Sequence, residues 1–310
     1  MQRKLYKNRE VLAGYGWMSV AVLIWASWLV LTSSGRVTAL SVVDLAWFRA
    51  AIPAAVLLPV LWRNREHVAR LGVKRCVLLS AYGAPFTLCV GYGLTFAPVA
   101  HAGAMVPGLM PVFAIALGAI FLGQRISPRK AVASLFILSG TGVILWYTSS
   151  APEGDAVWVG HVLFLLGALC WACFAVTLGR SDVGPFVATA IVAALSVLVL
   201  TPILAFPGVS QISSADLRDV TFQAVFQGVL AGLVSLFAFG RALQLIGSRA
   251  AALTALTPGI AAVLAIPVLD QFPHGAEAAA LILVILGLFV QATDAANAPK
   301  ANHQTHARRD

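Results

Sequence analysis

The sequence contains a repeat of about 147 residues, and this repeat restricts the folds that the chain can adopt. Trp25-Ala26 returns as Trp171-Ala172, and the same residue recurs in the pairs Ala104 and Ala251, Pro111 and Pro258, Leu122 and Leu269, Gln124 and Gln271, and Gly140 and Gly287. Each half holds five long apolar segments. A repeated unit with an odd number of membrane crossings enters the bilayer in opposite orientations, which is the inverted-repeat architecture of many transporters.

The composition excludes an ordinary soluble domain. Mean hydropathy is +0.88 and only 11% of the residues are charged, against about 25% in soluble proteins. A helix needs about 20 apolar residues to cross a bilayer. Ten segments meet this length, at 11–32, 41–62, 75–96, 101–122, 129–148, 159–179, 184–205, 222–244, 248–269 and 275–292. We therefore expect an all-α integral membrane protein of ten transmembrane helices, arranged as two inverted five-helix repeats.

These repeats divide the chain at 1–150 and 151–310, and the second ends in a short cytoplasmic tail. The basic residues before the first segment resemble the start of a signal peptide. However, its apolar run is too long and the residues after it form a poor cleavage site, so we expect a retained helix.

The net charge of +9 reflects orientation in the membrane rather than nucleic-acid binding. With the N-terminus in the cytoplasm, 18 of the 21 Lys and Arg residues lie in cytoplasmic loops and ends. Only Arg36 and Arg218 lie outside, and Arg49 lies within a span. This positive-inside pattern predicts that both termini are cytoplasmic and that the loops around Glu153, Asp155 and Asp216 are external.

Residues 93–145 carry the most specific local pattern, GLTFAPVAHAGAMVPGLMPVFAIALGAIFLGQRISPRKAVASLFILSGTGVIL. The second half repeats it at 240–290 as GRALQLIGSRAAALTALTPGIAAVLAIPVLDQFPHGAEAAALILVILGLFV. Both stretches resemble the EamA domain of the drug/metabolite transporter (DMT) superfamily. The length and the Trp and Tyr content resemble the YddG-type aromatic amino-acid exporters of that superfamily.

One feature departs from the family pattern. The resemblance implies Glu after the fourth and ninth helices, where this chain has Gln124 and Gln271. An amide keeps hydrogen bonding but has no charge. A role in capping a helix therefore carries over, whereas a role in proton transfer does not.

Aromatic side chains in the middle of spans are candidates for binding substrate. Trp25 and Trp171 occupy equivalent places in the two repeats, and Tyr82 and Tyr92 lie in the third helix. Buried Trp N–H and Tyr O–H groups need partners, and interfacial belts do not explain aromatic residues at this depth. The alternative is that these residues face lipid or pack in the bundle core.

Polar residues suggest further contacts. Gln223, Gln227 and Ser235 have the spacing of one helix face, which could line a cavity or form a hydrogen-bonded seam between helices. Arg49 could attract a substrate carboxylate, pair with Asp44 at an outer gate, or extend toward the interface. His101 begins the fourth helix, either as a gate or pH-sensitive group or as a solvated helix-start residue.

Small residues and prolines predict closely packed, kinked helices in the fourth and ninth segments. Pro107, Pro111 and Pro258 are hinge candidates, or prolines tolerated in a well-packed bundle. We expect one central cavity, bounded by the first, third, fourth, sixth, eighth and ninth helices.

Together with these features, the resemblance to YddG-type exporters implies a secondary carrier that exports amino acids, including aromatic ones, across a bacterial-type inner membrane. No carboxylate lies at mid-span and no nucleotide motif occurs, so we expect a facilitator without ATP or cofactor. The alternative is a proton-coupled DMT exporter of drugs or other metabolites. The four cysteines are expected to pack in spans rather than bind metal. The expected partners are the small-molecule substrate and the lipid bilayer, with no nucleic acid and no obligate protein partner.

Overall fold

The computed structural model describes residues 2–33, 37–150 and 156–297, and every regular element in these ranges is a helix. The predictions for Arg36, Glu153, Asp155 and the end of the tail from residue 298 fall outside the described residues. The helices are α1 (Gln2–Leu31), α2 (Val42–Arg63), α3 (Arg65–Leu71), α4 (Val73–Ser80), α5 (Ala84–Phe96), α6 (Val99–Leu122), α7 (Pro128–Ser150), α8 (Val157–Leu178), α9 (Pro185–Leu204), α10 (Leu217–Gln223), the π-helix η1 (Ala224–Val234), α11 (Ser235–Ile246), α12 (Ser248–Leu253), the 3₁₀ turn η2 (Thr254–Leu256), α13 (Thr257–Leu269) and α14 (Gly275–Asn297).

Within these ranges, nine helical stretches are long and apolar enough to cross a membrane. One joins α4 and α5 at Val73–Phe96, and another joins α10, η1 and α11 at Leu217–Ile246. The expected continuous helix over 248–269 is instead divided into α12, η2 and α13. Pro258, in the first turn of α13, lacks the backbone N–H that would continue an earlier helix, which explains the break.

The main contacts between helices occur in equivalent sets, in which each helix is replaced by the corresponding helix of the other repeat. Equivalent segments pack on each other in the pairs α2 with α9, α6 with α13, and α7 with α14. The other major contacts come in exchanged pairs: α1 on α11 matches α8 on α5, α1 on α13 matches α8 on α6, and α2 on η1 matches α9 on α4. The structure therefore has the contact pattern of a pseudo-two-fold repeat.

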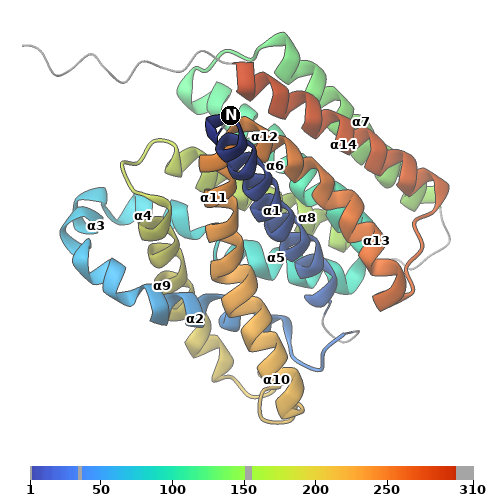
Figure 1. Cartoon of the computed structure of the whole chain (residues 1–310). Helices are drawn as coiled ribbons and strands as arrows, with labels where there is room; N and C mark the ends of the chain where they lie inside the picture. The colour runs from blue at the N-terminus through green and yellow to red at the C-terminus, as the bar shows by residue number, and fades with distance from the viewer. Residues whose placement is uncertain (1, 34–36, 151–155, 298–310) are drawn as a thin grey trace, which may run out of the picture.

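The bundle has a buried core and an apolar exterior. Phe164, Leu94 and Met105 are almost fully buried, whereas Trp146 and Phe121 are 78% and 74% exposed. A soluble protein rarely leaves so many large apolar side chains uncovered, and a lipid bilayer would cover them. Figure 1 shows α7 beside α14 along one edge, with α2, α3, α4 and α9 toward the other.

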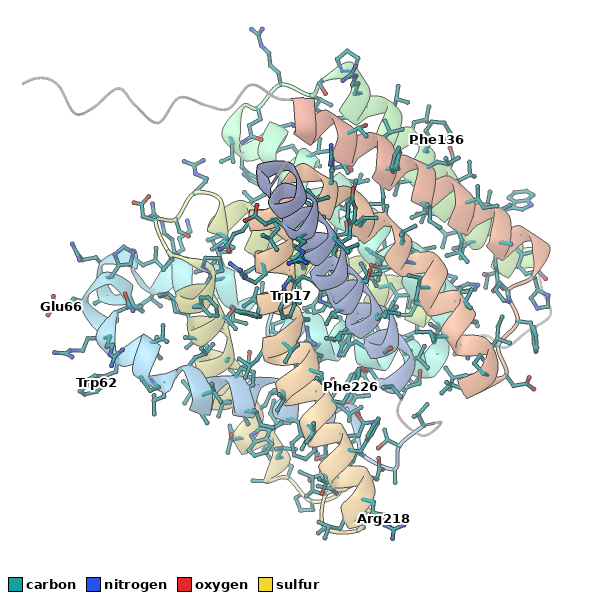
Figure 2. All side chains as sticks on the ribbon, in the orientation of Figure 1. Trp17, Trp62, Glu66, Phe136, Arg218 and Phe226 are labelled. Carbon is teal, nitrogen blue, oxygen red and sulfur yellow. The ribbon has the colours of Figure 1, made fainter. Side chains whose placement is uncertain are left out.

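Charged side chains such as Glu66 and Arg218 lie near the ends of the apolar segments. Glu66 points away from the bundle on α3, as does Trp62 at the end of α2, and Arg218 does so on α10 (Figure 2).

Candidate functional site

A cavity of about 90 Å³ lies between the middles of five apolar segments. About 10–15 Å³ of such volume accommodates one water molecule, so this space is large enough for several. Its lining residues come from α1, α2, the α4–α5 segment, α9 and the η1–α11 segment: Trp25, Ala46, Arg49, Ala50, Pro53, Tyr82, Gly83, Thr87, Thr189, Val192, Ala193, Ser196, Ala231, Gly232, Ser235 and Leu236. We call this space the central cavity.

The first turn of α2 fixes the direction of the helix that carries Arg49. Ser41 caps it in a capping box with Asp44, in which each side chain accepts the other's backbone N–H. The Asp44 carboxylate also accepts hydrogen bonds from the Ser210 hydroxyl at 2.7 Å and the Gln211 N–H at 2.9 Å. Asp44 therefore anchors α2 to the loop after α9. It does not pair with Arg49, contrary to one of the alternatives from the sequence.

Among the residues that the structure describes, Arg49 is the only charged side chain lining the central cavity. Its Nη2 donates to the Tyr82 hydroxyl at 3.2 Å, and its Cζ lies 4.7 Å from the centre of the Trp28 ring. Its Nη1 is buried without a hydrogen-bond partner, and no carboxylate pairs with it in the described part of the chain. A buried, unpaired charge is costly, so this guanidinium is suited to receiving an anionic group.

Aromatic rings support the guanidinium. Trp28 stacks on Phe86 with ring centres 5.6 Å apart, and its indole N–H donates to Gln227. Tyr82 packs against Phe86 and Phe174 at 5.1 and 4.9 Å. These contacts fix the face on which Arg49 rests, which favours a defined position of its charge.

The remaining wall combines apolar surface with a few hydroxyl groups. Trp25 packs on Phe239 with ring centres 5.3 Å apart. Ser235 and Ser196 donate to backbone carbonyls of their own helices, so their oxygen atoms keep acceptor capacity on the cavity side. Ser196 also accepts the backbone N–H of Ala84, which joins α9 to the start of α5.

The predicted polar stripe of the eighth segment divides into two parts. Gln227 accepts from Trp28 and donates to Thr32 and Gln223, while Gln223 donates to the carbonyl of Leu31. Both glutamines are fully buried in this seam between the end of α1 and the α10–η1 segment. Only Ser235 reaches the central cavity. The wider turns of the π-helix between Gln223 and Ser235 break the regular helical spacing on which the stripe was predicted.

Several other predicted site residues lie away from the central cavity. Tyr92 is 42% exposed on the outside of α5, and Trp171 packs against the main hydrophobic core. Trp17, which is not among the predicted site residues, points from α1 toward α11, where it meets the edge of Phe237 (Figure 2).

The hinge candidates belong to packed helices. Pro107 and Pro111 lie inside α6, and Pro258 lies in the first turn of α13. A side chain at Gly103 would come within 3.3 Å of the Pro258 carbonyl oxygen, so α6 and α13 are in close contact. None of these residues lines the central cavity. The fourth, sixth and ninth segments, which were expected around it, contribute instead to a second space.

The second cavity has a volume of about 200 Å³. It lies where α6, α8 and α14 begin and where α7 and α13 end. Its lining residues are Pro98, Ala100, His101, Tyr147, Thr148, Val157, Ala262, Ala265, Asp270, Gln271, Phe272, Pro273, His274 and Glu277. It shares no residue with the central cavity and is built from α6, α7, α8, α13, α14 and the turn before α14. We call it the outer cavity.

His101 contacts two buried titratable side chains beside the outer cavity. Its Nε2 lies 2.6 Å from Glu277 Oε1, and its Nδ1 lies 3.0 Å from His161 Nε2. The sequence identified His101 but gave no signal for its partners, which are 60 and 176 residues away. Nearby, the Gln271 side chain accepts the N–H of Val99 at 3.0 Å, which confirms the predicted capping role for this glutamine.

No group of His, Cys, Asp and Glu side chains in the described residues has the arrangement of a metal site. All four cysteines are free thiols within spans.

Comparison with known proteins finds the same two-part repeat. The model of the EamA-like transporter family matches twice, at residues 12–146 and 158–293. One solved crystal structure, described only as that of a protein, is 22% identical and has a TM-score of 0.54. The similarity covers 93% of this chain and 98% of that one, and it shows a shared fold. No curated protein matches the chain.

Proposed function

The chain belongs to the EamA-like transporter family, a group of DMT-type secondary transporters, and we propose that it exports amino acids, including aromatic ones, by alternating access. In this proposal the protein lies in a bacterial-type inner membrane with both termini in the cytoplasm. Ten segments cross the membrane, the interrupted α12–α13 segment among them. The repeated contact pattern supports an inverted repeat, because five crossings per unit reverse its orientation.

The observation that carries the substrate proposal is the unpaired Nη1 of Arg49 in the central cavity. A substrate carboxylate would supply the missing charge and accept hydrogen bonds from the guanidinium. Arg49 is the single cation that the described part of the chain contributes to the cavity, which suits one carboxylate better than a phosphate with two or more negative charges.

The rest of the cavity suits a neutral or aromatic amino acid. The ammonium group of the amino acid can meet the hydroxyl oxygen of Ser235 or Ser196 and the face of Trp25. Its side chain can lie against Ala46, Val192 and the other apolar residues of the wall. Burying an apolar side chain contributes roughly 1.5–3 kcal/mol. Because similar apolar side chains differ by only about 1–3 kcal/mol in such a pocket, we expect broad selectivity.

The second candidate function is a proton-coupled exporter of drugs or other metabolites. A cationic drug would be repelled by Arg49, and the central cavity has no carboxylate among its lining residues to attract it. Proton coupling stays compatible with the fold, because Glu277 and His101 are buried at the outer cavity. These two residues bear on the response of transport to pH and not on the class of substrate that is bound.

Purified full-length protein in liposomes tests the substrate proposal by counterflow of labelled tryptophan. Unlabelled tryptophan should compete, and tryptamine, which lacks the carboxylate, should not. Arg49→Gln should reduce tryptophan exchange tenfold or more, since a hydrogen bond to a charged group contributes about 1.5–3 kcal/mol. Arg49→Lys should retain part of the activity.

Arg65→Gln is the matched control, because Arg65 also stacks over a tryptophan, 5.0 Å from the ring of Trp62, but at an exposed site. Equal competition by tryptamine and tryptophan in the unmodified protein would refute the carboxylate site even if Arg49→Gln did not fold.

A further inference from the structure

Three buried side chains at the outer cavity form a continuous chain of contacts across three helices. His101 belongs to α6, His161 to α8 and Glu277 to α14. Their exposed fractions are 4%, 4% and 5%. The second oxygen of Glu277 accepts the backbone N–H of His274 at 2.7 Å. Because the helices come from both repeats, the three residues tie together parts of the molecule that are distant in sequence.

Charge balance determines how protons are arranged in this chain. A buried carboxylate without a counter-charge is costly, and the His101 ring beside Glu277 removes that cost when it carries a proton on each nitrogen. The ring then donates through Nε2 to Glu277 and through Nδ1 to His161 Nε2. In this arrangement His161 is neutral, with its own proton on Nδ1. The cluster holds one ionising proton and has no net charge.

A second proton does not fit this arrangement. The free lone pair of the neutral His161 ring is the one that accepts from His101, at 3.0 Å. A proton bound there would place two N–H groups and two positive charges against each other. The contact between α6 and α8 would then have to open.

The outer cavity gives solvent a path to the cluster. His101 and Glu277 line it, and so does Val157, one helical turn before His161 on α8. The other titratable groups that line it are Tyr147 from α7, Asp270 after α13 and His274 before α14. Tyr147 faces His274 with ring centres 5.9 Å apart. In the proposed topology this end of the helices is external.

We propose that His101, His161 and Glu277 form a proton-binding site that ties the outer ends of α6, α8 and α14 and releases α8 when a second proton binds. The ligand is the proton itself, and external acidity is the signal. The site shares no residue with the central cavity, so it controls movement of the helices independently of which substrate is carried.

Thermal unfolding of the purified full-length protein in detergent tests this proposal without any substrate. An unfolded chain takes up protons on histidine near pH 6.5, whereas the folded site accepts the second proton only by losing a contact. His161→Gln keeps a hydrogen-bonding group beside His101 without a titrating ring, so it removes this loss. Lowering the pH from 7.5 to 5.5 should therefore lower the melting temperature of the unmodified protein by about 2 °C relative to that of His161→Gln.

Two control variants separate the cluster from other histidines. His274→Gln changes a side chain of the same cavity, and His67→Gln changes one on α3 at the opposite ends of the helices. Both should retain the pH difference of the unmodified protein. In liposomes with equal pH on both sides, counterflow should be about threefold faster at pH 5.5 than at pH 7.5, and this increase should disappear in His161→Gln.

If His161→Gln does not fold, Glu277→Gln provides the second variant, since it removes the charge that holds the first proton. A melting temperature that depends on pH equally in the unmodified protein and in the cluster variant would overturn the proposal. This outcome does not depend on the substrate, so it is distinguishable from a failure of the carboxylate site at Arg49.

Discussion

Gly140 and Gly287 make the same contact from the two sides of the α7–α14 pair. A Cβ on Gly140 would lie 2.7 Å from the carbonyl oxygen of Ala280, and one on Gly287 would lie 2.8 Å from that of Ala133. Both glycines and both alanines are equivalent positions of the repeat, 147 residues apart. Glycine at both places lets the two backbones approach closely, so the repeat in the sequence is also a repeat of contacts.

A first prediction concerns the stability of this pair. Gly140→Ala should destabilise the protein by about 1–3 kcal/mol, because the added methyl group meets backbone that cannot move aside easily. Gly142→Ala is the control on the same helix, where an added Cβ has no atom within 4 Å. It should be neutral or stabilising by about 0.5–1 kcal/mol. Melting temperatures of the purified variants measure both effects, and equal loss in the two would contradict the close contact.

The hydroxyl of Tyr82 should contribute to transport through Arg49. Tyr82→Phe removes the hydrogen bond from Nη2 and should lower tryptophan exchange about tenfold or more, since a hydrogen bond to a charged group contributes roughly 1.5–3 kcal/mol. Tyr92→Phe, on the exposed side of α5, should have no effect.

The assignment of Tyr92 and Trp171 to the substrate site can be tested separately. Neither residue lines the central cavity, so Tyr92→Ala and Trp171→Ala should leave the relative rates for tryptophan and threonine unchanged. A changed ratio of the two rates in either variant would show that the substituted residue belongs to the substrate site.

The glutamine seam should matter for folding rather than for selectivity. Gln227→Leu leaves the buried N–H of Trp28 without an acceptor, which costs about 1–3 kcal/mol. Gln244→Leu provides a control at an exposed position of α11. The melting temperature should fall only in the first variant, whereas relative rates for different amino acids should be the same in both.

Transport should continue without ATP and without an imposed proton gradient. The central cavity has no titratable carboxylate, and a proton at the outer cavity changes the rate without supplying energy. Counterflow in liposomes with equal pH on both sides measures this directly. Exchange that stops whenever the gradient is removed would show obligatory proton coupling instead.

The orientation can be tested with single cysteines at positions 154 and 216 in a variant that lacks the four native cysteines. An impermeant maleimide added to intact cells should label both positions, because the distribution of Lys and Arg predicts that these loops are external. Labelling that requires opened membranes would reverse the proposed topology.

The sequence predicted the features that depend on local pattern. Apolar length predicted nine of the ten expected spans, whereas the span expected at 248–269 is divided, and the repeated residues indicated the exchange of contacts between the halves. Trp25, Arg49, Tyr82 and Ser235 were identified because a polar or aromatic group at membrane depth needs a buried or solvated environment. These four do lie around one cavity.

The features that were not predicted depend on distance in three dimensions or on local helix geometry. His161 carries no pattern that relates it to His101, and Glu277 lies near the end of its segment, where a charge is unremarkable in the sequence. The stripe from Gln223 to Ser235 assumed a regular α-helix, and η1 interrupts that regularity. Thr87 and Ser196 were missed because hydroxyl groups are common within membrane helices and do not by themselves mark a cavity.

The two cavities draw on different sets of helices: one uses α1, α2, α5, α9, η1 and α11, and the other uses α6, α7, α8, α13 and α14. Substitutions around Arg49 can therefore alter the cargo without touching the residues that respond to acidity. Conversely, the response to acidity can be retuned at His161 without loss of chemical selectivity. A carrier divided in this way can be adapted to a new metabolite and to a new habitat by separate mutations.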